Sequence, residues 1–465
     1  MVVLGWALGG GANASIVVDS LAQAVTCRKA AASPRSTGPA TPAWRRLAGV
    51  ATVLGSLALA GCGSTAAASA QAASPPATSG TQPTSSAQTA GSVPAQYQSQ
   101  YATIQAQTLA FQAMAGSPAS AGSTTVGVEL LAANGNIGTG LLTAHAISGV
   151  ESELDAARSL GIQGVTVCVS FPLLLPGTPD SSGYLSFYEQ VAQQVRARGI
   201  VLSVEENPIF AGTPLTTLPI SYSGLTLTSY AAEERQEAQI IIDDLDPQYL
   251  SLLTEPDTYS SVLHVAIDTP AAATRAVTDE LTGLNRGATL VGAGTGTSSS
   301  PAIDQSLLTT SIDYLDVHVY PEAPADLANL ASDVSAAKTA GRPLAMDETW
   351  LYKDFTDGGF STDGTSRPGV DGAPNEMKDV SLSFWEPLDE TYVAAMVIYV
   401  RSQGFSYVAF FDGSRCFFGY LTWSAQLQSA AYQTFSQQYN QVVSADFASL
   451  TISGTGDTLR QAIAG

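Results

Sequence analysis

Strand-like and helix-like segments alternate eight times along this chain, and that alternation limits its possible folds more than any other feature. The strand-like runs are short and apolar, and the runs between them carry apolar residues at helical spacing. The predicted strands are 126–131, 164–171, 200–204, 249–255, 289–292, 314–320, 344–348 and 407–411. This pattern is typical of a parallel α/β fold. Eight units favour a closed (β/α)8 TIM barrel over an open sheet, and no Gly-rich dinucleotide motif follows the first strand.

The same periodicity predicts the helices. They are 96–115, 147–160, 184–198, 230–245, 269–284, 325–340, 390–403 and 425–439. We expect the first to pack on the outside of the barrel. We expect the helix at 230–245 to present Glu233, Glu234, Arg235 and Glu237 to solvent, as charged residues on a helix usually do.

The beginning of the chain resembles a bacterial lipoprotein signal. Arg45 and Arg46 precede an apolar or small-residue run at 47–58, and Leu-Ala-Gly-Cys at 59–62 resembles a lipobox. The alternatives are an ordinary secretory signal or a membrane anchor, but the run is shorter than the about 20 residues that a span requires. The resemblance implies lipidation of Cys62 and stable anchoring through several acyl chains.

These features divide the chain into four parts. Residues 1–61 are an upstream leader and signal peptide, 62–95 are a Ser/Thr/Ala/Pro-rich linker, 96–445 are the barrel and 446–465 are a C-terminal tail. We expect a monomer that is exported and lipid-anchored at the bacterial cell surface or periplasmic face.

Composition excludes several classes of function. A net charge of -21 argues against nucleic-acid binding, because phosphate contacts need a basic surface. The four cysteines fit neither a metal knuckle nor a disulfide framework, and a structural role is expected for Cys168 and Cys416. The chain has three histidines and no His-Glu-x-x-His motif. No metal or organic cofactor is implied.

Two of the predicted strands end in a glutamate. Glu255 follows the fourth strand and is itself followed by Pro256, and Glu348 ends the seventh strand. The carboxyl ends of barrel strands form the active-site face, so these two acids are expected to meet across its mouth. A surface acid at a strand end is the ordinary alternative for either one. Two facing carboxyl groups are what glycosidic bond cleavage requires.

These glutamates and the segment Asp316-Val317-His318-Val319-Tyr320-Pro321 resemble the clan A retaining glycoside hydrolases. The resemblance implies that Glu255 is the acid/base, that Glu348 is the nucleophile, and that His318 and Tyr320 approach the nucleophile and the sugar. One residue departs from the family pattern. Thr254 stands where the family usually has an Asn that binds the sugar 2-hydroxyl.

Further residues near the predicted strand ends are candidates for sugar binding. Glu205 and Asn207 follow the third strand, although an Asn before Pro more often forms a turn. Trp350 and Trp385 bracket a long Gly/Asp-rich loop, and aromatic faces suit sugar rings, although packing is the more common role. Two further aromatic candidates are Tyr352 and Phe411. Asp347 is expected to point to the outer layer, because side chains alternate along a strand.

The sequence therefore predicts a glycoside hydrolase that cleaves β-glycosidic bonds in a poly- or oligosaccharide by a retaining two-glutamate mechanism. Because of Thr254, a non-catalytic carbohydrate-binding lipoprotein stays open as an alternative. That alternative would have a degenerate barrel, and a structural surface protein with no sugar site is the third hypothesis. Fold alone does not choose among the three.

Overall fold

The computed structural model describes residues 93–116, 124–211, 216, 218–321, 323–351, 353, 381–411, 413–430 and 432–465. The predicted leader, Cys62, nearly all of the linker, Tyr352 and most of the loop before Glu386 lie outside these ranges. Among the helices in the described ranges, none has the length and apolar character needed to cross a membrane.

Eight parallel strands form the centre of the described structure. They are β1 (Thr125–Glu129), β2 (Gly164–Phe171), β3 (Val201–Pro208), β4 (Tyr249–Ser251), β5 (Leu290–Gly296), β6 (Tyr314–His318), β7 (Leu344–Ala345) and β8 (Tyr407–Phe410). Their order is β7-β6-β5-β4-β3-β2-β1-β8. The ring closes between β7 and β8, the two ends of this order, where the Met346 N–H donates to the Tyr407 carbonyl at 3.1 Å. The predicted (β/α)8 barrel is confirmed.

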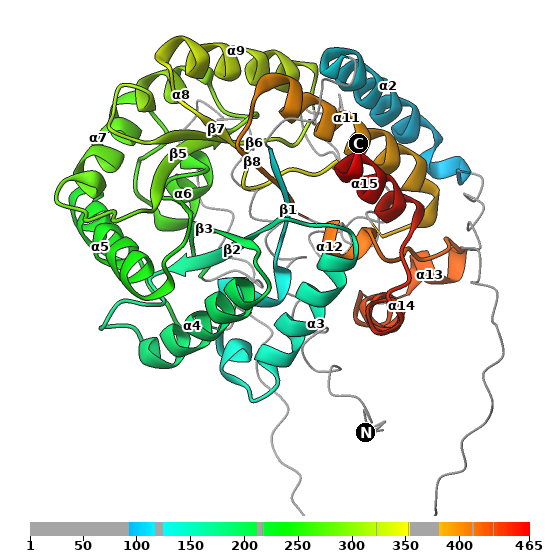
Figure 1. The fold of residues 1–465 in the computed structure, drawn as a ribbon, viewed down its shortest axis with the longest axis horizontal. Coiled ribbons are helices and arrows are strands. Elements are labelled where there is room, and N and C mark those ends of the chain that lie inside the picture. The colour runs from blue at the N-terminus through cyan, green and yellow to red at the C-terminus, as the bar shows by residue number, and fades with distance from the viewer. Residues whose placement is uncertain are drawn as a thin grey trace, which may run out of the picture. The chain divides into compact units, whose positions relative to one another are not determined.

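Helices surround the strands, as Figure 1 shows. The outer ring contains α3 (Ala146–Ser159), α4 (Ser181–Ala197), α5 (Leu227–Ile240), α7 (Pro270–Leu281), α8 (Pro301–Leu307), α9 (Pro324–Ala340) and α11 (Glu386–Gln403). Short 3-10 segments are η2 (Ala95–Tyr97), η3 (Leu131–Ala133), η4 (Gly135–Leu142, kinked at Gly138) and η6 (Ser383–Trp385), and η5 (Ile241–Leu245) is a short π-helix. Two helices that we did not predict, α6 (Pro256–Leu263) and α8, follow β4 and β5. Both are short and begin with proline at the first helical position.

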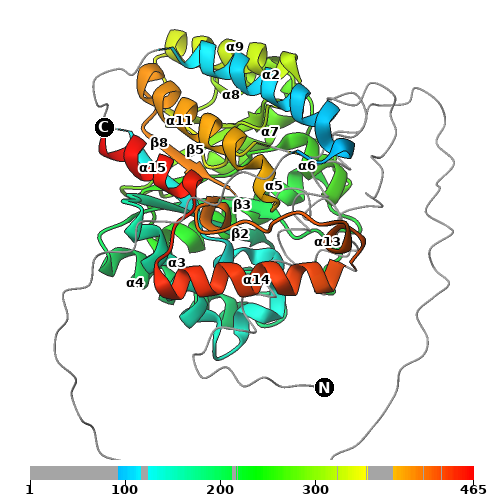
Figure 2. The same cartoon turned by 90° about the vertical axis from the view of Figure 1, so that its right-hand side faces the viewer.

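The two ends of the described chain pack together on the outside of the barrel. The helix α2 (Gln98–Ala115) lies along α11, as predicted for 96–115 (Figure 2). The predicted helix at 425–439 is instead two helices, α13 (Ala425–Ser429) and α14 (Tyr432–Ser449), and α12 (Gly413–Cys416) precedes them. The predicted tail contains α15 (Gly454–Ala464), which Arg401 of α11 fixes by donating to the carbonyls of Ala462 and Ile463. The C-terminal segment is therefore part of the barrel's outer layer.

The interior of the barrel contains a buried polar group that we predicted wrongly. Asp347 is fully buried and accepts hydrogen bonds from Ser203 at 2.7 Å and from Ser251 at 2.6 Å. It points inward because regular pairing of β7 ends at Ala345, so strict alternation does not extend to residue 347. Burial raises the pKa of Asp347 well above its ordinary value, and the nearby Asp316 raises it further.

The expected exposure of α5 is also wrong in part. Glu234 and Glu237 are fully buried between this helix and the barrel, whereas Glu233 is half-buried. The helix therefore turns two of its acids toward the sheet.

Candidate active site

The two strand-end glutamates lie on the same face of the barrel. Glu255 directly precedes α6, and Pro256 starts that helix, so the chain turns sharply after the strand. The Thr258 hydroxyl, three residues later, donates to Glu255 Oε2 at 2.9 Å and fixes the rotamer of the acid. Glu348 follows the irregular end of β7. Glu255 is 8% exposed and Glu348 is 2% exposed, so both belong to a largely dry site.

The imidazole of His318 joins the two carboxyl groups. Its Nδ1 lies 3.2 Å from Glu255 Oε1 and 3.5 Å from Glu348 Oε2. Those two oxygens therefore cannot be farther apart than the sum of the two distances. Retaining glycosidases hold their carboxyl groups about 5–5.5 Å apart and inverting ones about 6.5–9.5 Å apart. The limit on this one pair of oxygens is compatible with the retaining spacing.

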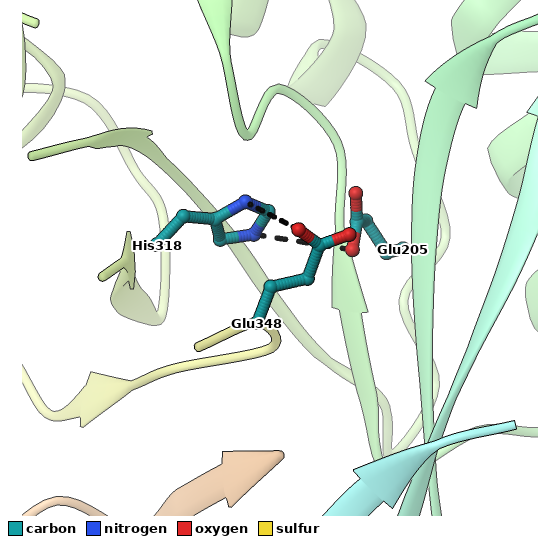
Figure 3. Close-up of side chains that lie close together, drawn as sticks. All are labelled: Glu205, His318 and Glu348. Carbon is teal, nitrogen blue, oxygen red and sulfur yellow. Dashed lines mark ion pairs between the residues drawn. The ribbon is translucent and has the colours of Figure 1, made fainter. Parts of the chain in front are cut away.

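Acidic side chains lie near both ring nitrogens of His318. Nε2 lies 3.4 Å from Asp316 Oδ2 and 3.9 Å from Glu205 Oε2, and Figure 3 shows Glu205 and Glu348 approaching the ring from two elements. Burial alone lowers the pKa of His318, but Glu205, Asp316 and Glu255 together raise it well above its ordinary value. The surrounding carboxyl groups therefore favour the protonated form of the ring.

A metal ion is a second possible occupant of these side chains. Glu205, His318 and Glu348 each place a ligand atom within 4.8 Å of the others. The acids that raise the pKa of His318 favour its protonated form, and that form has no lone pair to offer a metal.

Tyr320 contacts Glu348 directly. Its hydroxyl donates to Glu348 Oε2 at 2.6 Å, and its ring meets Phe411 edge to face with centroids 6.1 Å apart. Donation of a hydrogen bond to a carboxylate favours the ionised form of that carboxylate. An ionised and oriented Glu348 is able to act as a nucleophile.

Thr254 and Glu205 form a pair beside the two glutamates. The Thr254 hydroxyl donates to Glu205 Oε1 at 3.3 Å, and both side chains are buried. The threonine hydroxyl therefore points along the site wall toward β3. It supplies one hydroxyl where a longer amide would supply both a donor and an acceptor.

A pocket at this face is lined by side chains that follow or end five strands, β1, β3, β4, β7 and β8. Its lining residues are Asn134, Glu205, Asn207, Phe210, Thr254, Glu255, Thr258, Tyr259, Glu348 and Phe411. Of the sequence candidates, Glu205, Asn207 and Phe411 thus join the two glutamates. The Asn207 Oδ1 accepts from the Ser170 hydroxyl at 2.7 Å, which leaves its amide N–H groups available to the pocket.

Sequence reasoning missed Asn134, Phe210, Thr258 and Tyr259. Asn134 follows β1 by five residues, and its amide donates to Glu129 Oε1 at 3.1 Å. Its position after a strand end was a usable signal. Thr258 and Tyr259 belong to α6, which we did not predict.

The two tryptophans that we expected at the sugar site are packing residues. Trp385 is fully buried and stacks on Tyr101 of α2, with centroids 5.5 Å apart. Trp350 is 1% exposed and meets Phe410 and Phe417 edge to face. Neither ring lines the pocket. The prediction of a sugar platform at these positions is therefore not met in the described part of the chain.

Comparison with known proteins gives similarity in structure alone. No family model matches the sequence, and no curated protein matches it. Among solved structures, the chain is similar to GH5_18 from Bifidobacterium longum subsp. longum, with 12% identity and a TM-score of 0.47, over 74% of this chain and 79% of that one.

Two further solved structures show the same range of similarity. The exo-β-1,4-mannosidase from Opitutaceae bacterium strain TAV5 has 15% identity and a TM-score of 0.44, and the match covers 70% of this chain and 60% of that one. The family 1 β-glucosidase from Thermotoga maritima has 12% identity and a TM-score of 0.35, over 64% of this chain and 86% of that one. The chain is thus similar, at low identity, to solved structures whose names include a β-mannosidase and a β-glucosidase.

Proposed function

We propose that this protein is a glycoside hydrolase that cleaves β-glycosidic bonds in a poly- or oligosaccharide with retention of configuration. The observation that supports it best is the meeting of Glu255 and Glu348 on one buried imidazole, an arrangement compatible with the spacing of retaining enzymes. The pocket lined by both acids is the place for the scissile bond.

In the first step, Glu348 attacks the anomeric carbon while Glu255 gives its proton to the glycosidic oxygen, so one C–O bond forms as the other breaks. In the second step, Glu255 takes a proton from water, which attacks the same carbon and releases Glu348. Tyr320 keeps Glu348 ionised between turnovers. The cationic His318 reduces the repulsion between two acids held so close together.

The test is a panel of soluble β-glucans, β-mannans and β-xylans together with aryl β-glycosides, assayed for release of reducing ends or phenol. For a positive substrate, proton NMR of the first product reports its anomeric configuration. Retention is expected, and inversion would contradict the mechanism. Binding of oligosaccharide with no turnover of any substrate would favour the carbohydrate-binding alternative that Thr254 raises. Neither binding nor turnover would favour a structural role.

Loss of the Tyr320 hydroxyl is expected to lower kcat/KM by about 10²-fold, the loss typical for one preorganised donor. Because this donor favours the ionised form of Glu348, the acid limb of the pH–rate profile should move to higher pH in Tyr320→Phe. Tyr184→Phe is the matched control, since it removes a buried hydroxyl outside the pocket. An unchanged acid limb in Tyr320→Phe would contradict the role given to Tyr320.

We also propose that the protein is exported and anchored through a lipid on Cys62, on the basis of the sequence Leu-Ala-Gly-Cys at 59–62. In a bacterial host, wild-type protein should fractionate with membranes and Cys62→Ser should be released, because the acyl chains supply the binding energy. Mass spectrometry of the mature N-terminus checks the modification. An unmodified wild-type Cys62, or a Cys62→Ser variant still bound to membranes, would refute the anchor.

A further inference from the structure

A second group of acids lies behind the candidate active site, on the outer side of β3. Glu205 points into the site, and the next residue, Glu206, points the other way toward the helices. There it meets Glu234 and Glu237 of α5 and Glu280 of α7. The four side chains are fully buried or nearly so. Glu206, Glu234 and Glu237 each place a carboxylate oxygen within 4.8 Å of the others.

Most oxygens of this outer glutamate cluster (Glu206, Glu234, Glu237 and Glu280) have no hydrogen-bond partner. Both oxygens of Glu206, Glu234 and Glu280 are unpaired, as is one oxygen of Glu237. The other Glu237 oxygen accepts from the Leu174 N–H at 2.6 Å. Within the described ranges, no lysine, arginine or histidine forms an ion pair with the cluster.

A neutral side chain gives an independent sign of a ligand. The Tyr230 side chain is fully buried, and its hydroxyl forms no hydrogen bond of ordinary geometry. It lies near Glu234, whose pKa it lowers as a donor, and Glu234 and Glu280 in turn raise the pKa of the hydroxyl in addition to burial. Its oxygen is thus a further donor atom that faces the same space.

Burial of so many unpaired acids requires compensation, either by protons or by a cation. A cation bound between the carboxylates would neutralise their charge and give the unpaired oxygens of Glu206, Glu234 and Glu280 a partner.

We propose that Glu206, Glu234, Glu237, Glu280 and Tyr230 form a buried Ca²⁺ site. All of the donors are hard oxygens, which suit Ca²⁺ or Mg²⁺. Ca²⁺ binds oxygen at about 2.3–2.6 Å, so opposite ligands are about 4.6–5.2 Å apart, and one oxygen each of Glu206, Glu234 and Glu237 converges within that span. Mg²⁺ needs about 2.0–2.1 Å and usually keeps several waters, which suits a cage made entirely of protein groups less well.

The site would tie β3 to α5 and α7, directly behind Glu205 and Thr254. It departs from our sequence-based expectation of no metal, which rested on the cysteine spacing and the few histidines, and from the separate expectation that Glu234 and Glu237 face solvent. The proposal does not depend on the proposed hydrolase activity, and its readouts are metal content and thermal stability.

The experiment begins with elemental analysis of protein purified without chelator. About one Ca²⁺ per chain is expected. The protein is then unfolded in urea with EDTA and refolded with or without CaCl₂ at pH 7, and Tm is measured. Ca²⁺ should raise Tm by at least about 5 °C, since a ligand that binds the folded state alone stabilises it by mass action. MgCl₂ and MnCl₂ are separate arms.

The double variant Glu234→Gln/Glu237→Gln should lose both the bound Ca²⁺ and the response of Tm to CaCl₂. Glu233→Gln, on the same helix but half-buried and outside the cluster, is the matched control and should keep both. Absence of stoichiometric metal in the wild-type protein together with a Tm unaffected by Ca²⁺ would overturn the proposal. Equimolar Mg²⁺ or Mn²⁺ in place of Ca²⁺ would overturn the assignment of the ion. The metal content of the wild-type protein and the response of its Tm to CaCl₂ test the proposal even if the double variant does not fold.

Discussion

Substitution of Glu348 by Gln is expected to reduce kcat by about 10⁴-fold or more on every substrate that the wild-type protein turns over. The amide cannot form the glycosyl intermediate, so the variant loses covalent catalysis in addition to the factor typical of one acid–base group. The change keeps the size of the side chain and its capacity to accept from Tyr320. Tm should therefore stay within a few degrees of the wild-type value.

The matched control for this variant is Glu189→Gln, the same substitution at an exposed site on α4. It should leave kcat, KM and Tm unchanged. Initial rates with an aryl β-glycoside and thermal unfolding of all three proteins complete the comparison. If Glu348→Gln retained more than about one tenth of the wild-type kcat, Glu348 would not be the nucleophile.

The second large effect is expected for Glu255→Ala, and its size should depend on the leaving group. Glu255 supplies the proton that a poor leaving group needs, and general acid catalysis contributes roughly 10² to 10⁴ in rate. Natural oligosaccharides should lose about that factor in kcat/KM. A dinitrophenyl glycoside needs no protonation to depart, so its kcat/KM should change far less.

The same variant also lacks the base for the second step. Added azide, which needs no deprotonation, should therefore accelerate turnover of the dinitrophenyl glycoside and give a β-glycosyl azide. Glu348→Gln should show no such rescue to the β-azide. Equal losses on good and poor leaving groups, with no azide product, would remove Glu255 from the acid/base role.

Much of the fold could be predicted from the sequence, because apolar periodicity reports directly on strands that are buried on both faces. β2 has the predicted bounds, Gly164–Phe171, since it pairs along its whole length with β3. β7 is shorter than predicted. Its regular pairing ends at Ala345, and irregular hydrogen bonds to the neighbouring strands carry the chain on to Glu348. Period-2 reasoning fails at that break, and this is why the orientation of Asp347 was wrong.

The candidate site was predicted from residues that follow the predicted strands, and this criterion identifies only part of a site. It brought Glu255, Glu348, His318 and Tyr320 to one face, where the structure places them in contact. It could not distinguish a sugar platform from packing, since Trp385 stacks on a helix that lies outside the barrel. It also had no access to α6, whose residues enter the site through a short helix with little periodicity.

The outer glutamate cluster shows a different limit. Charged residues on a helix are nearly always exposed, so the sequence of α5 favours solvent for Glu234 and Glu237. Both side chains are buried, and they face Glu206. Glu206 points to the outer side of β3 because its neighbour Glu205 points into the barrel. Glu205 belongs to the candidate active site and Glu206 to the outer glutamate cluster, and the two can be told apart only from the directions of their side chains.

The central claim is that Glu348 forms a covalent bond to the sugar, and trapping that intermediate tests it most directly. A 2-deoxy-2-fluoro β-glycoside with a dinitrophenyl leaving group, built on a sugar that the protein hydrolyses, should inactivate it and add the mass of one fluorosugar per chain. Peptide mapping should place that mass on Glu348. Attachment to another residue, or steady hydrolysis of natural substrate with inverted product and no trapped adduct, would contradict the account.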